Sequence, residues 1–255
     1  MIEYPVTING IKGTAQYSRR SVDEIFLPFL ENLTGMQRAA GRRILVMLAA
    51  PPGAGKSTLL SFLDFLAKET EGIAQIQAVG MDGFHRRQEY LLSHDTVRDG
   101  KPVRMVEVKG APETFDLEAL TGRVKRLASG EKTPWPTYDR LLHNPVEDAV
   151  LVDGNIVILE GNYLLLDMDG WRDLKAFADY TVSVRADESL LRERLISRRI
   201  RTGTAREAAV RFVDFSDMPN VRLCLARSAP ADLQLETDAR GEYRVIDSCT
   251  QADKP

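Results

Sequence analysis

The glycine-rich segment of this chain reads Ala50-Pro51-Pro52-Gly53-Ala54-Gly55-Lys56-Ser57-Thr58. An unbroken apolar run at 44–49 precedes this segment, and apolar residues at helical spacing follow it at 59–66. A strand, a glycine-rich turn and a helix in this order form a phosphate-binding loop, where backbone N–H groups surround a phosphate at the helix N-terminus. The segment departs from the usual pattern only at its first position, where Ala50 replaces a glycine.

The side chains of this loop indicate a nucleotide with bound Mg²⁺. Lys56 is predicted to reach the β- and γ-phosphates, where it both binds the nucleotide and assists catalysis, and the Ser57 hydroxyl is predicted to hold Mg²⁺. The residues predicted to bind ATP here are Gly53, Ala54, Gly55, Lys56, Ser57 and Thr58. The alternative is an ordinary glycine-rich turn with a solvated lysine, which the flanking strand and helix disfavour.

The composition narrows the class of protein. A chain of 255 residues with 44% hydrophobic residues can bury a full core, and its 34 basic and 37 acidic residues do not favour a nucleic-acid partner. Cys224 and Cys249 form neither a metal-binding spacing nor a disulfide framework, which favours a reducing compartment. No secretory signal and no apolar run of about 20 residues is visible. We therefore expect a cytoplasmic protein without membrane contact.

Apolar runs that read as strands recur along the chain. They lie at 44–49, 73–79, 155–159 and 180–184, and a final strand or hairpin is expected at 232–246. Helical patterns at 117–127 and 187–201 alternate with them. This alternation is typical of βαβ crossovers and predicts an α/β fold with three α/β/α layers around a mainly parallel central sheet.

The first forty residues are interpreted as a helical extension, separate from a catalytic domain at 41–255. Ser21 and Glu24 have the spacing of a capping box, and apolar residues at 22–33 form one helical face. Pro28 lies inside this pattern and predicts a kink or a break. The apolar face can pack either on the chain's own core or on a second subunit, so a homodimer is a candidate assembly.

Two segments, at 84–111 and 133–146, lack a regular pattern and are interpreted as functional loops. The first holds His85, and the second holds Tyr138, Arg140 and His143. Their polar side chains are candidates for binding a polyhydroxylated substrate. A lone histidine is more often a structural residue, and that reading stays open for His85.

Two carboxylates directly follow predicted strands. Asp82 comes after the strand at 73–79, and Glu160 ends the run at 156–159. Because the carboxyl ends of parallel strands meet at one edge of the sheet, both are expected beside the phosphate-binding loop. Asp82 is the candidate base and a candidate Mg²⁺ ligand, and Glu160 is a candidate Mg²⁺ ligand. A turn-capping aspartate and a surface glutamate are the alternatives.

The predicted helix at 187–201 carries five arginines. Arginine binds phosphate through two parallel donors, so a lid at about 194–215 is predicted to close over ATP. Arg194 and Arg198 are predicted to contact the nucleotide, and Arg199 is predicted to act in catalysis. The alternative is a solvated helix whose arginines pair with neighbouring glutamates.

Together these motifs resemble the P-loop kinase family that includes uridine kinase, phosphoribulokinase and bacterial pantothenate kinase. The resemblance covers about residues 40–225 and adds MDGFH at 81–85, KGAPETFD at 109–116, PTYD at 136–139 and ILEG at 158–161 to the glycine-rich segment. The block at 109–116 looks most like pantothenate kinase, and the block at 136–143 most like uridine kinase. The stretch at 160–167 is similar to a nucleoside-kinase-like, fructose-transport-associated branch.

The resemblance implies ATP-dependent phosphorylation of a hydroxyl group on a small metabolite. It implies catalysis by Asp82, Mg²⁺ ligation by Ser57 and Glu160, substrate contacts by His143 and an arginine lid. Asn162, within the branch-like stretch, is also assigned to the substrate. A sugar or polyol is the favoured acceptor, and a uridine-type nucleoside and pantothenate are the alternatives. A regulatory ATPase or GTPase is disfavoured because the guanine-reading Asn-Lys-x-Asp motif is missing.

Overall fold

The computed structural model describes residues 1–8 and 11–246 and centres on a six-stranded sheet. The strand order is β12-β11-β10-β3-β9-β4, and every neighbouring pair is parallel except β11 and β12. The strands are β3 (Ile44–Ala49), β4 (Ile76–Gly80), β9 (Ile156–Gly161), β10 (Tyr180–Arg185), β11 (Leu233–Thr237) and β12 (Tyr243–Val245). The predicted, mainly parallel sheet is confirmed.

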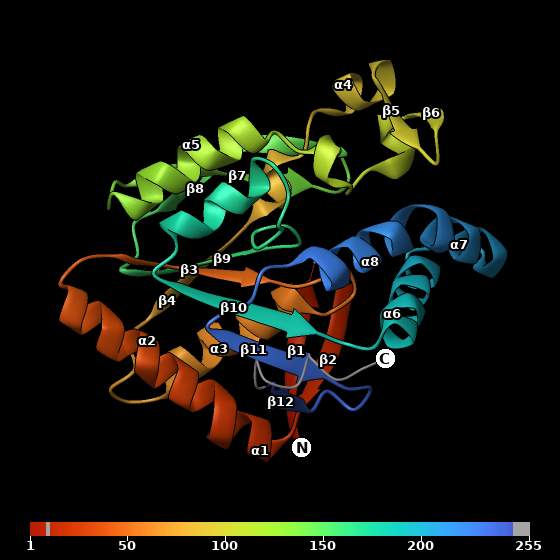
Figure 1. Cartoon of the computed structure of the whole chain (residues 1–255). Coiled ribbons are helices and arrows are strands. Elements are labelled where there is room, and N and C mark those ends of the chain that lie inside the picture. The colour runs from red at the N-terminus through yellow and green to blue at the C-terminus, as the bar shows by residue number, and fades with distance from the viewer. Residues whose placement is uncertain (9–10, 247–255) are drawn as a thin grey trace.

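Helices cover both faces of this sheet. Figure 1 shows α5 (Leu117–Ala128) on one side and α2 (Leu27–Ala40) and α3 (Lys56–Glu69) on the other. Side chains of β3 alternate between two separate buried clusters, one on each face. Burial on both faces explains why the strand reads as an unbroken apolar run, and it confirms the three-layer α/β/α arrangement. In the described part of the chain, no helix combines the length and the apolar character that crossing a bilayer requires.

The prediction of a helical extension over residues 1–40 is wrong for its first half. Residues 2–17 form an antiparallel hairpin of β1 (Ile2–Ile8) and β2 (Ile11–Tyr17). The helix then begins at α1 (Arg19–Ser21), with Ser18 rather than Ser21 as its cap, because the Ser18 hydroxyl accepts a hydrogen bond from the Ser21 N–H at 2.9 Å.

Pro28 neither breaks the helix nor separates it into two pieces. The backbone widens into a π turn at Val22–Phe26, and α2 follows directly with Pro28 in its first turn. A proline removes one N–H donor and crowds the preceding turn, and the π turn is a local way to absorb that crowding.

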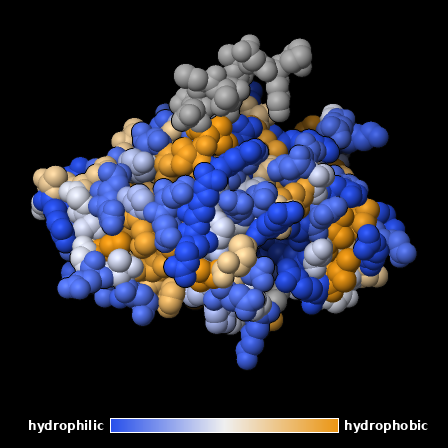
Figure 2. Space-filling model, turned by 90° about the horizontal axis from the view of Figure 1, so that it is seen from below, coloured by the Kyte–Doolittle hydropathy of each residue, from blue (hydrophilic) through white to orange (hydrophobic). Residues whose placement is uncertain are grey.

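The apolar face of the N-terminal helix packs within its own chain. Phe26, Phe29, Leu30 and Leu33 are buried in the cluster below the sheet. On the face seen in Figure 2, hydrophobic residues form separate patches between hydrophilic ones. The apolar face of this helix is thus already buried within its own chain and does not need a second subunit to cover it. A homodimer stays a prediction.

The N-terminal segment is also tied to the last described strand. The buried Ser21 hydroxyl accepts a hydrogen bond from the Tyr243 N–H of β12 at 2.9 Å, across 222 positions of sequence. The Tyr17 and Phe26 rings lie 6.2 and 5.1 Å from the Tyr243 ring, measured between centroids. The N-terminal segment and β12 therefore pack against each other.

Both segments interpreted as loops contain regular structure. The first holds α4 (Gln88–Ser93) and the short hairpin of β5 (Asp95–Arg98) and β6 (Lys101–Arg104). The second belongs to the hairpin of β7 (Thr133–Asp139) and β8 (Asn144–Val152). Prolines are tolerated in β7 because it pairs on one side only among the described strands. Trp135 anchors this strand by donating from its indole N–H to the Gly80 carbonyl at 2.8 Å.

Candidate active site

The three strands that end at the candidate site are neighbours in the sheet. Glu160 of β9 pairs in register with Leu48 of β3 and Gly80 of β4, so the segments that follow β3 and β4 flank it. These segments are the glycine-rich loop and the turn that carries Asp82. The predicted convergence at one sheet edge is therefore confirmed.

A cleft of about 860 Å³ opens at this edge. Most of the residues assigned from the sequence line it: Gly53, Gly55, Lys56, Ser57, Thr58, Asp82, His85, Tyr138, Arg140, His143, Glu160, Asn162, Arg194, Arg198 and Arg199. Ala54 is the exception, because it is buried beneath the loop with 2% of its surface exposed. Its side chain cannot reach a ligand in the cleft.

The loop adopts a backbone that only glycine accepts easily. Gly53 and Gly55 have φ angles of +84° and +89°, and a Cβ at Gly53 would lie 3.1 Å from the Leu191 carbonyl oxygen. The Leu59 N–H donates to the Gly55 carbonyl at 2.9 Å, so α3 begins directly at the loop. Free N–H groups of the first turn of a helix form an anion-binding site.

The Lys56 ammonium group connects the start of the loop with the segment that follows β9. Its Nζ donates to the Ala50 carbonyl at 3.2 Å and to Asn162 Oδ1 at 2.6 Å. Asn162, assigned to the substrate from the sequence, is thus the partner of the loop lysine in this structure. An amide is a neutral partner, which leaves the charge of Lys56 available to a phosphate.

Ser57 and Glu160 form the pair expected of a metal site. The Ser57 hydroxyl donates to Glu160 Oε1 at 2.7 Å. Burial at the base of the cleft raises the pKa of Glu160, and the nearby Lys56 charge opposes that rise. A cation bound here would compensate the cost of burying the carboxylate. Two hard oxygen ligands next to a phosphate-binding loop suit Mg²⁺, which is often bound through few protein ligands and the substrate phosphates.

Asp82 lies in the single 3₁₀ turn Met81–Phe84 that follows β4. Its carboxylate is 48% exposed, and the Arg140 guanidinium approaches Asp82 Oδ2 at 3.5 Å. The two side chains face each other in the same cleft as Lys56 and Glu160. The carboxylate is therefore accessible to a substrate hydroxyl.

Replacing Gly83 with alanine is expected to displace this turn. A Cβ at Gly83 would lie 2.2 Å from the Pro136 carbonyl oxygen, so the turn or β7 must move. We expect the free energy of unfolding to fall by about 1–3 kcal/mol and turnover to fall with it. Urea denaturation measures the first effect. Gly122→Ala in α5 is the control, since its Cβ meets nothing within 4 Å. Equal unfolding curves for Gly83→Ala and the wild type would contradict the close contact.

His85 follows the Asp82 turn directly. Its Nδ1 lies 2.8 Å from the Asp82 carbonyl oxygen, and its ring centroid lies 4.0 Å from that of Phe115 and 5.0 Å from that of Tyr138. Burial lowers the pKa of His85. A neutral imidazole packed against two rings fits the structural reading that the sequence left open, although His85 is also among the residues that line the cleft.

Lys109 is a cleft residue that the site prediction missed. Its Nζ donates to Gln88 Oε1 at 2.8 Å and to the His143 carbonyl at 2.9 Å, and it lies 4.9 Å from the centre of the Tyr138 ring. Burial lowers the pKa of Lys109 to about 8. The sequence contained a clue, because Lys109 opens the block at 109–116 that resembles pantothenate kinase. His143 reaches Lys109 through its backbone, and its own side chain is exposed.

The lowered pKa of Lys109 predicts a pH dependence of stability. The folded protein holds this proton less tightly than the unfolded chain does, so between pH about 8 and 10.5 the unfolded state binds more protons. The free energy of unfolding of the wild type should therefore rise over this range relative to that of Lys109→Met. Urea denaturation at several pH values, with the exposed Lys101→Met as control, measures the difference. A flat difference would contradict the burial of the charge.

The predicted lid region is a helical hairpin. It consists of α6 (Glu188–Arg201), α7 (Arg206–Phe212) and a π turn at Val213–Asp217 that leads into α8 (Met218–Arg227). Its closure stays a prediction.

The three arginines assigned to the nucleotide differ in how they are held. Arg194 donates to the Asp238 carbonyl at 2.9 Å. Arg199 pairs with Asp217 at 3.1 Å and lies 3.5 Å above the Phe212 ring, so its planar group is preoriented. Arg198 is exposed on the cleft wall.

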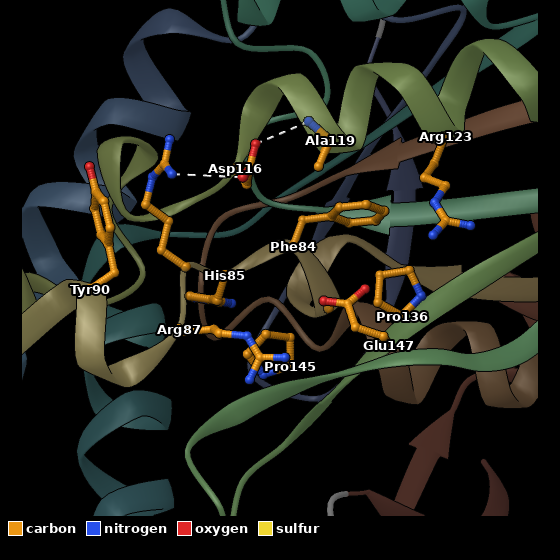
Figure 3. Close-up of a pocket in the computed structure, with 12 residues that line it drawn as sticks. Phe84, His85, Arg87, Tyr90, Asp116, Ala119, Arg123, Pro136, Pro145 and Glu147 are labelled. Atoms are coloured by element: carbon orange, nitrogen blue, oxygen red, sulfur yellow. Dashed lines mark hydrogen bonds and ion pairs between the residues drawn. The ribbon is translucent and has the colours of Figure 1, made fainter.

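A second pocket of about 310 Å³ lies on the other side of the Asp82 turn. Figure 3 shows it between α5, which carries Ala119 and Arg123, and the β7–β8 hairpin, which carries Pro136 and Pro145. An Arg86–Asp116 ion pair at 3.7 Å spans its upper side. Asp82 lines the active-site cleft, whereas Gly83 and Phe84 of the same turn line this second pocket.

Comparison with known proteins places this site in a family. Residues 45–235 match the model of the phosphoribulokinase / uridine kinase family. The chain is 41% identical over 239 residues to "Uncharacterized protein YggC" of Escherichia coli, which covers 93% of this chain and 97% of that protein. It is 30% identical to "Putative uridine kinase C227.14" of Schizosaccharomyces pombe, over 85% of this chain and 90% of that one.

A solved structure supports the same placement. The crystal structure of a "putative fructose transport system kinase" from Silicibacter sp. TM1040 superposes with a TM-score of 0.68 and 32% identity, over 79% of this chain and 98% of that chain. The family match spans the glycine-rich loop, the Asp82 turn, Glu160 and the arginine helix together. The chain therefore belongs to the phosphoribulokinase / uridine kinase family of P-loop kinases.

Proposed function

We propose that this P-loop kinase transfers the γ-phosphate of ATP to a hydroxyl group of a small metabolite, with a sugar or a sugar-like polyol as the favoured acceptor. The observation that carries the proposal is the arrangement of one cleft. Lys56 and the Ser57–Glu160 pair lie at the phosphate-binding loop, and the accessible carboxylate of Asp82 faces the same space. Membership of the family supports phosphotransfer and the use of ATP.

The residues divide the reaction between them. Ser57 and Glu160 would hold Mg²⁺, with Asp82 as a further candidate, and the metal supplies charge neutralisation on the phosphates. Asp82 accepts the proton of the acceptor hydroxyl and orients its oxygen toward the γ-phosphate. Lys56 and Arg199 stabilise the negative charge on the transferring group, and Arg194 and Arg198 bind the nucleotide.

The acceptor side of the cleft favours a hydroxyl-rich compound. Tyr138, Arg140, Lys109 and Gln88 present donors and acceptors there. The Tyr138 ring, which could stack on a nucleobase, already has Lys109 over it. These features support a sugar or polyol above a nucleoside. The names of two relatives, a uridine kinase and a fructose transport system kinase, keep both acceptor classes in the test.

The test is ADP release with ATP and Mg²⁺ across a panel of ketoses, aldoses, polyols, nucleosides and pantothenate. We expect one polyol or sugar to give strong release that Asp82→Asn removes. Strong release with uridine or pantothenate alone would retain the kinase and overturn the sugar assignment. Equal release in every well, including the well without acceptor, would indicate an ATPase and overturn the proposed phosphotransfer to a metabolite.

A further inference from the structure

The β1–β2 hairpin has an inner and an outer face. Exposure alternates along β1, with Tyr4 and Val6 half-buried and Pro5 and Thr7 exposed. The cross-strand partners of Tyr4 and Val6 are Ala15 and Gly13, so these four residues share the inner face. The inner face is the one that meets the rest of the molecule.

The lower part of this inner face is fixed on α3. The Tyr4 hydroxyl donates to the Ser61 carbonyl at 3.1 Å, and the Tyr17 ring stacks on Phe62 with centroids 4.1 Å apart. The hairpin also touches the turn between β11 and β12, because the Gln16 carbonyl leaves room only for a glycine at Gly241. These contacts give the hairpin one defined position beside α3 and the last strands of the sheet (Figure 1).

The upper part of the inner face is open. Val6 and Gly13 line the active-site cleft together with Gly55 and Thr58 at the start of α3, and the neighbouring β2 residues Lys12, Thr14 and Ala15 also border it. A Cβ at Gly13 would meet no atom within 4 Å. One residue pair beyond the packed Tyr4–Ala15 pair, the hairpin therefore presents a small, flat surface to an unfilled part of the cleft.

The direction of a bound nucleotide follows from the sheet order. The γ-phosphate must lie near Asp82 and Glu160, which follow β4 and belong to β9, on one side of β3. The nucleoside then leaves the loop toward the opposite side, where β10, β11 and β12 lie. The hairpin and the Arg194–Asp238 contact both lie on that side.

We propose that the inner face of the hairpin at Val6 and Gly13 is the wall on which the nucleobase of ATP packs. The inference rests on the proposed use of ATP. A planar base that packs on this surface removes apolar area from contact with water, which favours binding. No described strand pairs with the outer edge of β2, so backbone groups near Gly13 can hydrogen-bond to the edge of the base. The family match begins only at residue 45, so this wall lies outside it.

The test compares Gly13→Leu with the wild type for two ligands. One is the non-hydrolysable ATP analogue AMP-PNP with Mg²⁺, and the other is inorganic tripolyphosphate with Mg²⁺, which has no base. The Cβ of a leucine at residue 13 meets no atom within 4 Å, so its side chain can extend into the space proposed for the base. We expect calorimetry to show a Kd for AMP-PNP raised about tenfold or more, and a Kd for tripolyphosphate that stays within about twofold.

Gln16→Leu is the matched control, since residue 16 lies on the outer face of the same strand and does not line the cleft. Thermal melting of each variant without ligand shows whether the fold is kept. An unchanged Kd for AMP-PNP in Gly13→Leu overturns the proposed wall, and so does an equal loss for both ligands. If the wild type binds neither ligand, the proposed ATP-dependent function fails instead.

Discussion

Asp82→Asn is expected to lower kcat by about 10³-fold and to leave the affinity for ATP within about twofold of the wild type, because general bases contribute about 10²–10⁴-fold. Asparagine keeps the size of the side chain and its contact with Arg140, whose guanidinium lies 3.5 Å from the carboxylate. It cannot accept the proton that the acceptor hydroxyl releases. The loss should therefore appear in turnover and not in nucleotide binding.

The measurement is steady-state kinetics with the acceptor found in the panel, with ATP affinity measured separately by calorimetry. Asp153→Asn is a suitable control, because that carboxylate pairs with Lys132 at 3.6 Å outside the cleft. Near-normal turnover of Asp82→Asn with the true acceptor would remove Asp82 from its role as base. A loss of ATP affinity as large as the loss of turnover would indicate a role in metal binding instead.

Lys56→Ala is expected to weaken both ATP binding and catalysis. Each charge-assisted hydrogen bond to a phosphate contributes about 1.5–3 kcal/mol, so we expect the Kd for ATP to rise by about 10–100-fold. Lys56 also opposes the cost of burying Glu160 more strongly than Arg140 does, so its removal leaves the charge of that carboxylate less well compensated. The combined loss in kcat/KM should reach about 10³-fold or more.

Calorimetric titration with AMP-PNP and initial-rate kinetics measure these two losses. Lys68→Ala is the control from the same helix, since Lys68 pairs with Asp64 at the far end of α3. Unchanged nucleotide affinity in Lys56→Ala would argue against the assignment of residues 50–58 as the phosphate-binding loop.

The sheet and its polar edge could be predicted from the sequence. Strands β3 and β9 are buried on both faces, so they appear as apolar runs. Candidate site residues directly follow each run: the glycine-rich loop after β3, and Glu160 after the four aliphatic residues of β9. Glu160 stands out because a carboxylate directly follows four aliphatic residues. Parallel strands bring such positions to one edge of the sheet whatever their order, so a shared edge with Asp82 could be predicted, whereas their closeness depends on β3, β9 and β4 being neighbours.

The N-terminal hairpin could have been predicted but was missed. Residues 2–8 alternate between one face and the other, and Asn9-Gly10 follows them, which is the strongest short-range sequence pattern for a hairpin. The helical pattern begins only at residue 22 and does not cover these residues. For Lys109 the sequence offers only its place at the start of the 109–116 block, because its partners, Gln88 and the His143 carbonyl, come from distant segments. The β7–β8 hairpin was hidden by its prolines, which a strand at the edge of a sheet tolerates.

The hydrogen bond between Ser21 and Tyr243 has a consequence for biosynthesis. The N-terminal hairpin and helix leave the ribosome well before their partner in β12, because Tyr243 is made 222 residues after Ser21. At about 5–20 residues per second, the delay is on the order of 10–40 s. Throughout that time the Tyr17 and Phe26 rings lack their contact with the Tyr243 ring. The hairpin and helix are therefore fully held only after β12 has been made, and a ribosome-bound chain that stops before residue 243 should not hold this hairpin firmly beside the phosphate-binding loop.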